Sequence, residues 1–319
     1  MHEFHLINKY FSKLSKKNKG SFNLNDDVFF DKSKKLVISI DTYVEGIHFI
    51  DFKKPDLVIK KIIRSSISDI ICKGVKPKYY FISGSGNELS FTSSNLIKIS
   101  KSLKQEQNKY NIFLCGGDTV YSNKLSFTVT SVGFSKKIIS RNNAKLNDDI
   151  YVTGNLGDSF TGLNVLKRKI NINSSLAKYF TSKYYLPNLN LELSDKLLSI
   201  ANTSIDISDG LIADLEKLIN NQSFSYKLFI KNVPISKNLK KLLIQKKLDK
   251  ISFISRGDDY QILFTANSSK SRIIKRIAKS KGIKISKIGK ICSNLQKSQI
   301  IDEKGNKIAI KTKGYSHRF

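Results

Sequence analysis

Short apolar runs alternate with amphipathic segments along most of the chain, and this alternation constrains the fold more than any other feature of the sequence. Residues 36–41 (LVISID) have the length and β-branched content of a buried strand. Residues 56–73 carry isoleucines at helical spacing and are followed by Gly74, so they predict a helix that ends there. Alternating strands and helices are typical of an α/β protein, which is the fold class we predict.

The same patterns predict the remaining elements and two domains. Strands are expected at 78–82, 112–115, 125–134, 150–153, 204–207 and 260–265, with short strands around the turn at 303–306, and helices at 94–108, 158–168, 211–220 and 271–281. A chain of 319 residues fits two domains of about 150 residues each. Because the polar stretch 140–149 is the best candidate for a boundary, we expect an N-terminal α/β domain at 1–145 and a C-terminal α/β domain at 146–319.

The charge balance is strongly basic, with 56 Lys and Arg residues against 26 Asp and Glu and a formal net charge of +30. This balance is one signature of a nucleic-acid-binding protein. Only seven of the basic residues are arginine, however, and the lysines are dispersed over nearly every segment. A nucleic-acid groove concentrates Arg and Lys with aromatic residues on one surface. We therefore expect no nucleic-acid partner, and a basic nucleic-acid-binding protein is the alternative from a different functional class.

The cysteine count and the apolar runs indicate a compartment. Three cysteines cannot pair evenly, which favours a reducing environment. The longest apolar runs are far shorter than the ~20 residues that span a bilayer, and residues 1–20 lack the hydrophobic core of a secretory signal. We expect a cytoplasmic protein that does not bind a membrane.

Aspartates gather at predicted strand ends and in tight turns. They are Asp26, Asp27, Asp41, Asp69, Asp118, Asp206, Asp209, Asp258 and Asp259. Ligands of α/β proteins usually bind at loops that follow strands. Any one of these aspartates could instead be a turn former or a helix N-cap. Asp69 is different, because it lies between isoleucines of a predicted helix, where an unpaired charge is costly to bury.

Oxygen-rich clusters of this kind match the ligand preference of Mg²⁺. Zinc is disfavoured because the chain has four histidines and no cysteine pair at ligand spacing. The sequence contains neither G-x-x-x-x-G-K-[ST] nor G-x-G-x-x-G, the common phosphate-binding loops. A nucleotide would therefore be held largely through metal ions, with help from the backbone at 116–117.

Taken in order, the motifs resemble those of the thiamine-monophosphate kinase family, which shares a superfamily with aminoimidazole ribonucleotide synthetase and selenide water dikinase. The matching segments are NDD at 25–27, SIDTYVEGIHF at 39–49, SISDIICKGVKPKY at 66–79, CGGDT at 115–119, SR at 140–141, YVTGNLGDS at 151–159, SIDISDGLIADL at 204–215, RGDDYQILFT at 256–265 and GYSHRF at 314–319. They span nearly the whole chain. The resemblance implies two α/β domains with mixed sheets, in the architecture of aminoimidazole ribonucleotide synthetase.

The resemblance also implies an activity, ATP-dependent phosphorylation of thiamine monophosphate to thiamine diphosphate, and a set of site residues. Several Mg²⁺ ions would be held by Asp27, Ser39, Asp41, Asp69, Asp118, Asp206 and Asp209. ATP would contact Gly117, Asp118, Arg141 and Ser208, and thiamine monophosphate would contact His48, Asp258 and Tyr315. No general base is needed, because the attacking phosphate oxygen is already largely ionised at neutral pH. A homodimer through the N-terminal sheet is implied by the resemblance alone.

The chain differs from the family pattern at four places. Asn23-Leu24-Asn25 replaces Gly-x-Gly, Ile40 replaces a hydroxyl residue, Cys72-Lys73-Gly74 replaces Ala-Met-Gly, and Asp258 replaces a glutamate. The alternative enzyme is another ATP-using member of the superfamily with a different phosphate or amide substrate. A selenide dikinase would carry a reactive cysteine in a Gly-rich N-terminal segment, which this sequence lacks.

Overall fold

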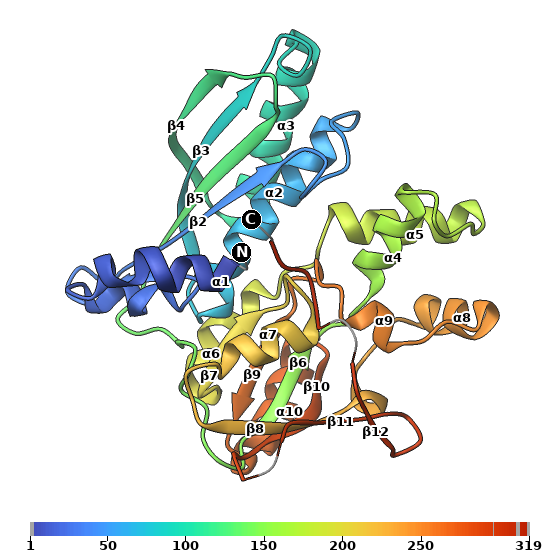
Figure 1. Ribbon diagram of the computed structural model, residues 1–319. Coiled ribbons are helices and arrows are strands. Elements are labelled where there is room, and N and C mark those ends of the chain that lie inside the picture. The colour runs from blue at the N-terminus through green and yellow to red at the C-terminus, as the bar shows by residue number, and fades with distance from the viewer. Residues whose placement is uncertain (1–2, 296, 311–312, 318–319) are drawn as a thin grey trace.

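Two mixed β-sheets form the framework of the molecule (Figure 1). The structure, a computed structural model, describes residues 3–295, 297–310 and 313–317. The N-terminal sheet has the order β1-β2-β5-β3-β4. Its strands are β1 (Phe29–Asp31), β2 (Leu36–Val44), β3 (Pro77–Gly86), β4 (Phe113–Tyr121) and β5 (Ser126–Phe134). Strands β3 and β4 pair in parallel and the other neighbours are antiparallel.

The C-terminal sheet has seven strands in the order β12-β11-β8-β10-β6-β9-β7. They are β6 (Asp149–Thr153), β7 (Thr203–Asp206), β8 (Phe224–Phe229), β9 (Ile262–Ala266), β10 (Ile285–Ser293), β11 (Gln299–Ile301) and β12 (Lys307–Ile308). Only the β11–β8 pair is parallel among the described strands of this sheet. The predicted α/β fold with mixed sheets is confirmed.

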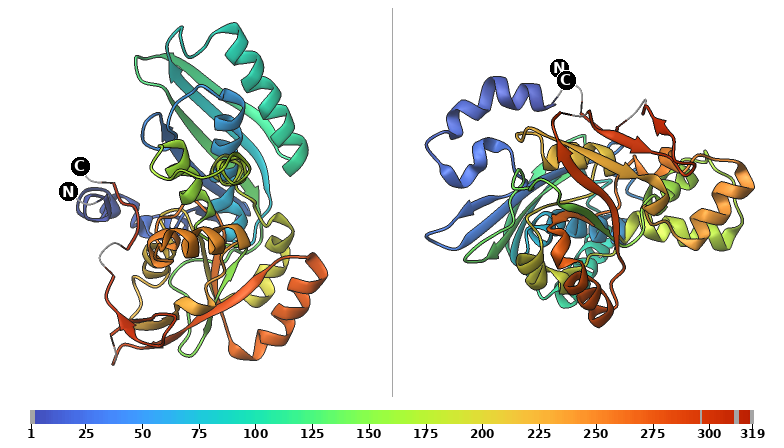
Figure 2. Two further views of the ribbon diagram at one scale, coloured as in Figure 1. Left: turned by 90° about the vertical axis from the view of Figure 1, so that its right-hand side faces the viewer. Right: turned by 90° about the horizontal axis from the view of Figure 1, so that it is seen from below.

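Helices cover both sheets (Figures 1 and 2). The α-helices are α1 (Glu3–Leu6), α2 (Pro55–Cys72), α3 (Ser93–Tyr110), α4 (Asp158–Leu166), α5 (Ser174–Tyr185), α6 (Ser194–Ile200), α7 (Leu211–Leu218), α8 (Lys237–Lys246), α9 (Ile251–Ile254) and α10 (Ser271–Lys281). Short 3-10 or π turns lie at Ile7–Phe11, Ser12–Ser15, Lys19–Leu24, Leu191–Leu193, Ile230–Asn232 and Ser268–Lys270. In Figure 1, α4, α5, α8 and α9 project together to one side of the C-terminal sheet. No helix in the described part of the chain is both long and apolar enough to cross a membrane.

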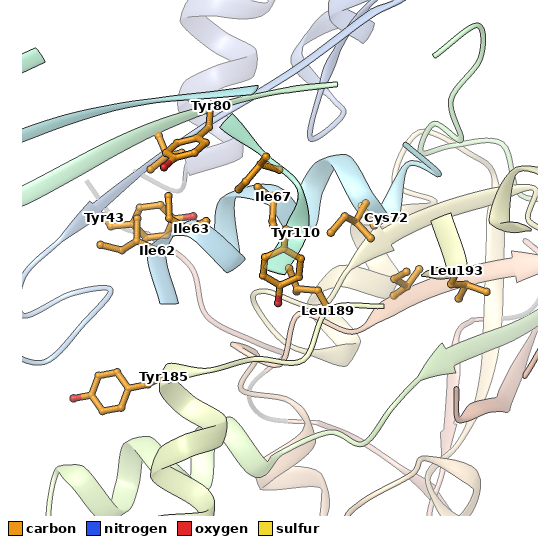
Figure 3. Packing of buried hydrophobic residues seen from close by; sticks show 14 of the residues in the cluster. Tyr43, Ile62, Ile63, Ile67, Cys72, Tyr80, Tyr110, Tyr185, Leu189 and Leu193 are labelled. Carbon is orange, nitrogen blue, oxygen red and sulfur yellow. The ribbon is translucent and has the colours of Figure 1, made fainter. Parts of the chain in front are cut away.

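Helix α2 positions the site, because it belongs to the cores of both halves of the molecule. Pro55 starts the helix, and Gly74, with φ +79°, follows its end. Its buried isoleucines pack in one cluster with Tyr80 of β3 and with Leu193 of the C-terminal half (Figure 3). Each such fully buried side chain contributes roughly 1.5–3 kcal/mol. The helix therefore holds its polar residues at a fixed place between the two sheets.

The predicted elements are all present, with shifted ends. The strand expected at 260–265 begins at Ile262, because Tyr260 has φ +51° and cannot continue a strand. Eight of the described helices and strands were not predicted, namely α1, β1, α5, α6, β8, α8, α9 and β10. The segment between Phe134 and Asp149 connects β5, the last strand of the N-terminal sheet, to β6, the first strand of the C-terminal sheet. The predicted domain boundary at 145/146 lies in this connection and stays a prediction.

Candidate active site

Three of the predicted metal ligands lie together beside α2. Asp41 lies on β2, Asp69 on α2 and Asp206 at the end of β7. The carboxyl groups of Asp41 and Asp69 share a hydrogen bond, and Asp206 acts on both through its charge. We refer to these three residues as the acid trio. The fold thus brings together carboxylates that are up to 165 positions apart in the sequence.

The acid trio is short of positive charge. Burial raises the pKa of Asp41 and of Asp206 to about 6, and hydrogen bonds from Tyr43 and Ser68 offset part of that rise. Burial and the charges of its two partners raise the pKa of Asp69 still further. Among the described residues, Oδ2 of Asp206 has no hydrogen-bond partner although the residue is only 2% exposed. Buried carboxylate oxygens with an unmet need for a positive partner are suited to a hard cation.

The donor chemistry fits Mg²⁺, although the described side chains form no complete cage. Within the described ranges, no group of three or more His, Cys, Asp or Glu residues is arranged to hold a metal ion without help. Mg²⁺ usually binds one or two protein carboxylates together with substrate phosphates and water, so an incomplete set is the expected arrangement. Ser39 is buried on the same strand face as Asp41 and donates to the carbonyl of Ser66 at 3.3 Å.

The predicted ligand Asp27 has different neighbours. Together with Asp26 it contacts Lys73, whose Nζ lies 2.8 Å from Asp26 and 2.6 Å from Asp27. The guanidinium of Arg141 pairs with both oxygens of Asp27, and the Arg141 backbone N–H donates to Asp26 at 2.8 Å. Arg141, predicted to contact ATP, is thus held against this acidic pair. Lys73 is the C-cap residue of α2, so it lies close to Asp69, and its charge lowers the pKa of that carboxyl.

Asp209 and Ser208 lie in the turn that precedes α7. The Asp209 carboxylate pairs with Lys217, which also contacts Asp214 at 3.1 Å. The backbone N–H groups of Asp209 and Gly210 both donate to Asp214 at 3.0 Å, which fixes the turn. The Ser208 carbonyl accepts from the backbone of Asp258 at 2.7 Å, so this turn lies against the segment with the predicted substrate carboxylate.

Asp118 and Gly117 lie apart from the acid trio, on the edge strand β4. The whole strand is exposed, and the Asp118 carboxylate accepts a hydrogen bond from the Thr119 N–H at 2.8 Å. Among the described residues it makes no ion pair or hydrogen bond with another predicted ligand. A Cβ at Gly117 would lie 1.8 Å from the carbonyl oxygen of Ile82, so the close approach of β3 requires glycine at this position.

The predicted substrate residues are linked by a buried lysine and a row of rings. Lys61 on α2 lies 2.5 Å from Asp258, and its ammonium lies over the ring of Tyr184 at 4.1 Å. The Tyr184 hydroxyl donates to the His48 carbonyl at 3.4 Å. The His317 ring lies 5.4 Å from His48 and 5.0 Å from Tyr315. His48, Asp258 and Tyr315 therefore belong to one region, although they come from three distant segments.

The His48 ring has a defined orientation. Its Nδ1 accepts a hydrogen bond from the Val44 N–H at 3.0 Å, so the proton of the neutral ring is on Nε2. Burial lowers the pKa of His48, and the neighbouring His317 lowers it further. The ring is therefore neutral at pH 7 and has Nε2–H available as a donor.

A cavity of about 740 Å³ opens beside Asp209. It is lined by α7, the N-terminal turns and the C-terminal segment, including Asn23, Asn25, Lys217 and Tyr315. The Tyr315 N–H donates to the Asp209 carbonyl at 2.9 Å, which holds the C-terminal segment against this wall. The last two residues of the GYSHRF motif lie outside the described residues. The volume is in the range of sites for small ligands.

Comparison with known proteins places this geometry in a family. Residues 25–135 match the AIR synthase related protein, N-terminal domain. Over 326 residues the chain is 35% identical to thiamine-monophosphate kinase of Buchnera aphidicola subsp. Acyrthosiphon pisum, with 99% of this chain and 98% of the relative covered. The chain belongs to the thiamine-monophosphate kinase family. The enzyme of Buchnera aphidicola subsp. Schizaphis graminum is 33% identical, with the same coverage.

A solved structure of the family has the same fold. AaThiL, complexed with AMPPCP and TMP, matches with a TM-score of 0.85 and 26% identity, covering 99% of this chain and 97% of that chain. The family resemblance inferred from the motifs is confirmed, as is the architecture that it implied.

Two residues of the site were missed from the sequence, Lys61 and Lys73. Both lie on or next to α2, a helix whose residues are buried on nearly every side. A lysine inside such a segment must have a buried anionic partner, which is a usable signal. Because lysines occur in nearly every segment of this chain, a lysine within an apolar segment did not stand out from the others.

Proposed function

We propose that this member of the family transfers the γ-phosphoryl group of ATP to thiamine monophosphate, forming thiamine diphosphate and ADP. It is thus an ATP-binding transferase of thiamine diphosphate biosynthesis. The proposal is carried by the 35% identity to a thiamine-monophosphate kinase over nearly the full length of both chains. The match to AaThiL, complexed with an ATP analogue and TMP, supports it.

Several Mg²⁺ ions would serve the reaction by neutralising and aligning the two phosphate chains. The acid trio and Ser39 are the residues best placed to hold them, because Asp206 has a buried oxygen that lacks a partner among the described residues. We keep Asp118 and Asp209 as proposed ligands that the phosphates or a partner subunit would complete, whereas Asp27 is already paired with Lys73 and Arg141. Asp209 already pairs with Lys217, and Asp118 is exposed on β4.

The chain's own groups would bind and orient the two substrates. Arg141, Ser208 and Gly117 are the proposed ATP contacts. His48 would donate Nε2–H to the phosphate of thiamine monophosphate, Asp258 would face its cationic ring, and Tyr315 would stack on it. Lys61 positions Asp258, since the two are paired at 2.5 Å. Holding both phosphates in line is the main contribution, because the acceptor oxygen needs no base.

We also propose that two copies of the chain form a dimer through the N-terminal sheet. Strand β4 has an unpaired edge, and Phe113, Leu114, Val120 and Tyr121 on it are exposed. Ile40 and Phe81 lie in one cross-strand row and are also exposed. An apolar sheet with an open edge is a typical subunit interface. A cytoplasmic location is proposed as well, since the three cysteines are free thiols.

A product assay tests the activity. The purified chain is incubated with ATP and thiamine monophosphate, with Mg²⁺ or with EDTA, and thiamine diphosphate is measured by mass. We expect product only with Mg²⁺. Thiamine replaces the monophosphate as a control, and we expect no thiamine diphosphate from it. Absence of product from a folded chain at saturating Mg²⁺ would refute the proposal and favour another phosphate or amide substrate of the superfamily.

A further inference from the structure

Lys73 places a buried ammonium group on the Asp26–Asp27 pair. Its Nζ lies 2.8 Å from Asp26 Oδ1 and 2.6 Å from Asp27 Oδ2, and it donates to the Ser204 carbonyl at 3.0 Å. An ammonium group has three N–H donors, so these contacts use all of them. The Lys73 side chain is completely buried. Its charge is therefore directed entirely at protein groups.

The fold fixes this ammonium group in place. The Lys73 N–H bonds to the Ile70 carbonyl at the end of α2, and its own carbonyl accepts from Ile139 at 3.0 Å. Its acceptor Ser204 lies on β7, two residues before Asp206. The lysine thus connects the N-terminal acidic pair, α2 and the C-terminal sheet, and its position is set by all three.

The oxygens of the Asp26–Asp27 pair are fully used by these and neighbouring donors. Asp26 Oδ1 also accepts from the Asp27 N–H, and Oδ2 accepts from the Arg141 N–H, both at 2.8 Å. Both oxygens of Asp27 contact the Arg141 guanidinium. By contrast, Oδ2 of Asp206 has no partner within the described part of the chain. The carboxylates of the site are therefore divided into a pair saturated by cations and a trio that lacks them.

We propose that Lys73 is a resident cation of the active site, whose ammonium group occupies the Asp26–Asp27 pair in place of a divalent ion and so keeps metal ions off that pair. This inference rests on the proposed function and adds to it which of the acidic residues hold no metal ion. Lys73 acts as a positioning residue, because it holds the pair that in turn orients Arg141.

The test is a count of Mn²⁺ bound per chain in the presence of saturating AMPPCP, by equilibrium dialysis. Lys73→Met keeps an unbranched apolar stem of similar length and removes the charge. We expect this variant to bind one more Mn²⁺ per chain than the wild type, at the Asp26–Asp27 pair that the ammonium group no longer occupies. Lys73→Arg keeps the charge and should give the wild-type count. The matched control is Lys76→Met, which removes an exposed lysine from the same region and should also leave the count unchanged.

Each outcome decides the proposal. An unchanged Mn²⁺ count in folded Lys73→Met chain overturns it, even with a lower melting temperature, because a purely structural lysine would affect stability alone. Should Lys73→Met fail to fold, Asp27→Asn decides: an unchanged count supports the resident cation, and the loss of one Mn²⁺ overturns it. A wild-type chain that binds neither AMPPCP nor Mn²⁺ would instead contradict the proposed function on which the inference rests.

Discussion

At Asp206, function and stability have opposite requirements. Its folded-state pKa of about 6 is above the ordinary value of 3.8 because the carboxyl is buried. The unfolded chain therefore ionises this group at lower pH than the folded chain does. Folding loses stability as pH rises from about 4 to 6, and the full cost of about 3 kcal/mol is present above pH 6.

We predict that Asp206→Asn stabilises the ligand-free protein while it lowers turnover. The neutral amide removes the cost of the buried charge, so the free energy of unfolding at pH 8 should rise by about 1–3 kcal/mol in EDTA. Turnover should fall by roughly 100-fold or more if the oxygen holds a metal ion. Denaturant titrations at pH 5 and pH 8 measure the first effect. Equal stability gains at both pH values would show that Asp206 is not the titrating group.

At His48, we predict a binding defect with little change in turnover number. His48→Ala removes the Nε2–H donor, and a hydrogen bond to a charged group is worth about 1.5–3 kcal/mol. The KM for thiamine monophosphate should rise roughly 10- to 100-fold, with kcat within a few-fold of wild type. Because the pKa of His48 is lowered, this KM should not change between pH 7.5 and 9 on account of His48. A fall in kcat at unchanged KM would contradict the assigned role.

The individual acids can be located from local sequence, whereas their partners cannot. Aspartates at strand ends and between helical isoleucines form recognisable local patterns, and these patterns include Asp41, Asp69 and Asp206 among nine candidates. The ligand set itself was implied by the family resemblance. The pairing of Arg141 with Asp27, across 114 positions, depends on tertiary contacts that no local pattern encodes. The same holds for Lys61 with Asp258, across 197 positions. Partners of buried charges are set by the fold and not by the motif.

At the scale of elements, one buried ion pair joins α2 to α3. Arg64 donates from Nε and Nη2 to the two carboxylate oxygens of Glu106 at 2.8 and 2.9 Å, and also to the Pro187 carbonyl. Both side chains are almost fully buried. Such a pair is costly to break because the remaining charge stays buried without a partner.

We predict that Glu106→Ala destabilises the protein by about 3–5 kcal/mol, since it leaves Arg64 buried and unpaired. Urea denaturation measures the change. The matched control is Asp195→Ala, which breaks the exposed pair with Lys76 and should cost under about 1 kcal/mol. Equal small effects of the two substitutions would contradict the contribution assigned to the buried pair.

The elements that were not predicted from the sequence differ in physical cause. Helix α8 (KNLKKLLIQK) and strand β10 (ISKIGKICS) are rich in lysine, which blurs the apolar periodicity from which they would be recognised. Strand β8 (FSYKLF) alternates apolar and polar residues over its first five positions, which is a usable strand signal. Helix α5 had a usable signal, because Asn173 caps it by accepting from Leu176 N–H.

For the whole molecule, we predict a dimer whose interface is the open face of the N-terminal sheet. Phe81→Lys places a charge in the row shared with Ile40 and should convert the dimer to a monomer. Light scattering after size-exclusion chromatography measures the mass. Ile244→Lys on α8 changes a residue that is 69% exposed elsewhere and should leave the mass unchanged. A wild-type chain that is monomeric at micromolar concentration would contradict this interface.

The proposed reaction requires divalent ions that the acid trio would hold beside the phosphates of both substrates. The most direct measurement is a crystal structure grown with Mn²⁺, AMPPCP and thiamine monophosphate, in which anomalous scattering locates each ion. We predict at least one Mn²⁺ within about 2.3 Å of oxygens from Asp41, Asp69 or Asp206 and of a phosphate oxygen. Ions found only at other carboxylates, with both substrates bound, would contradict the metal-binding role of the acid trio.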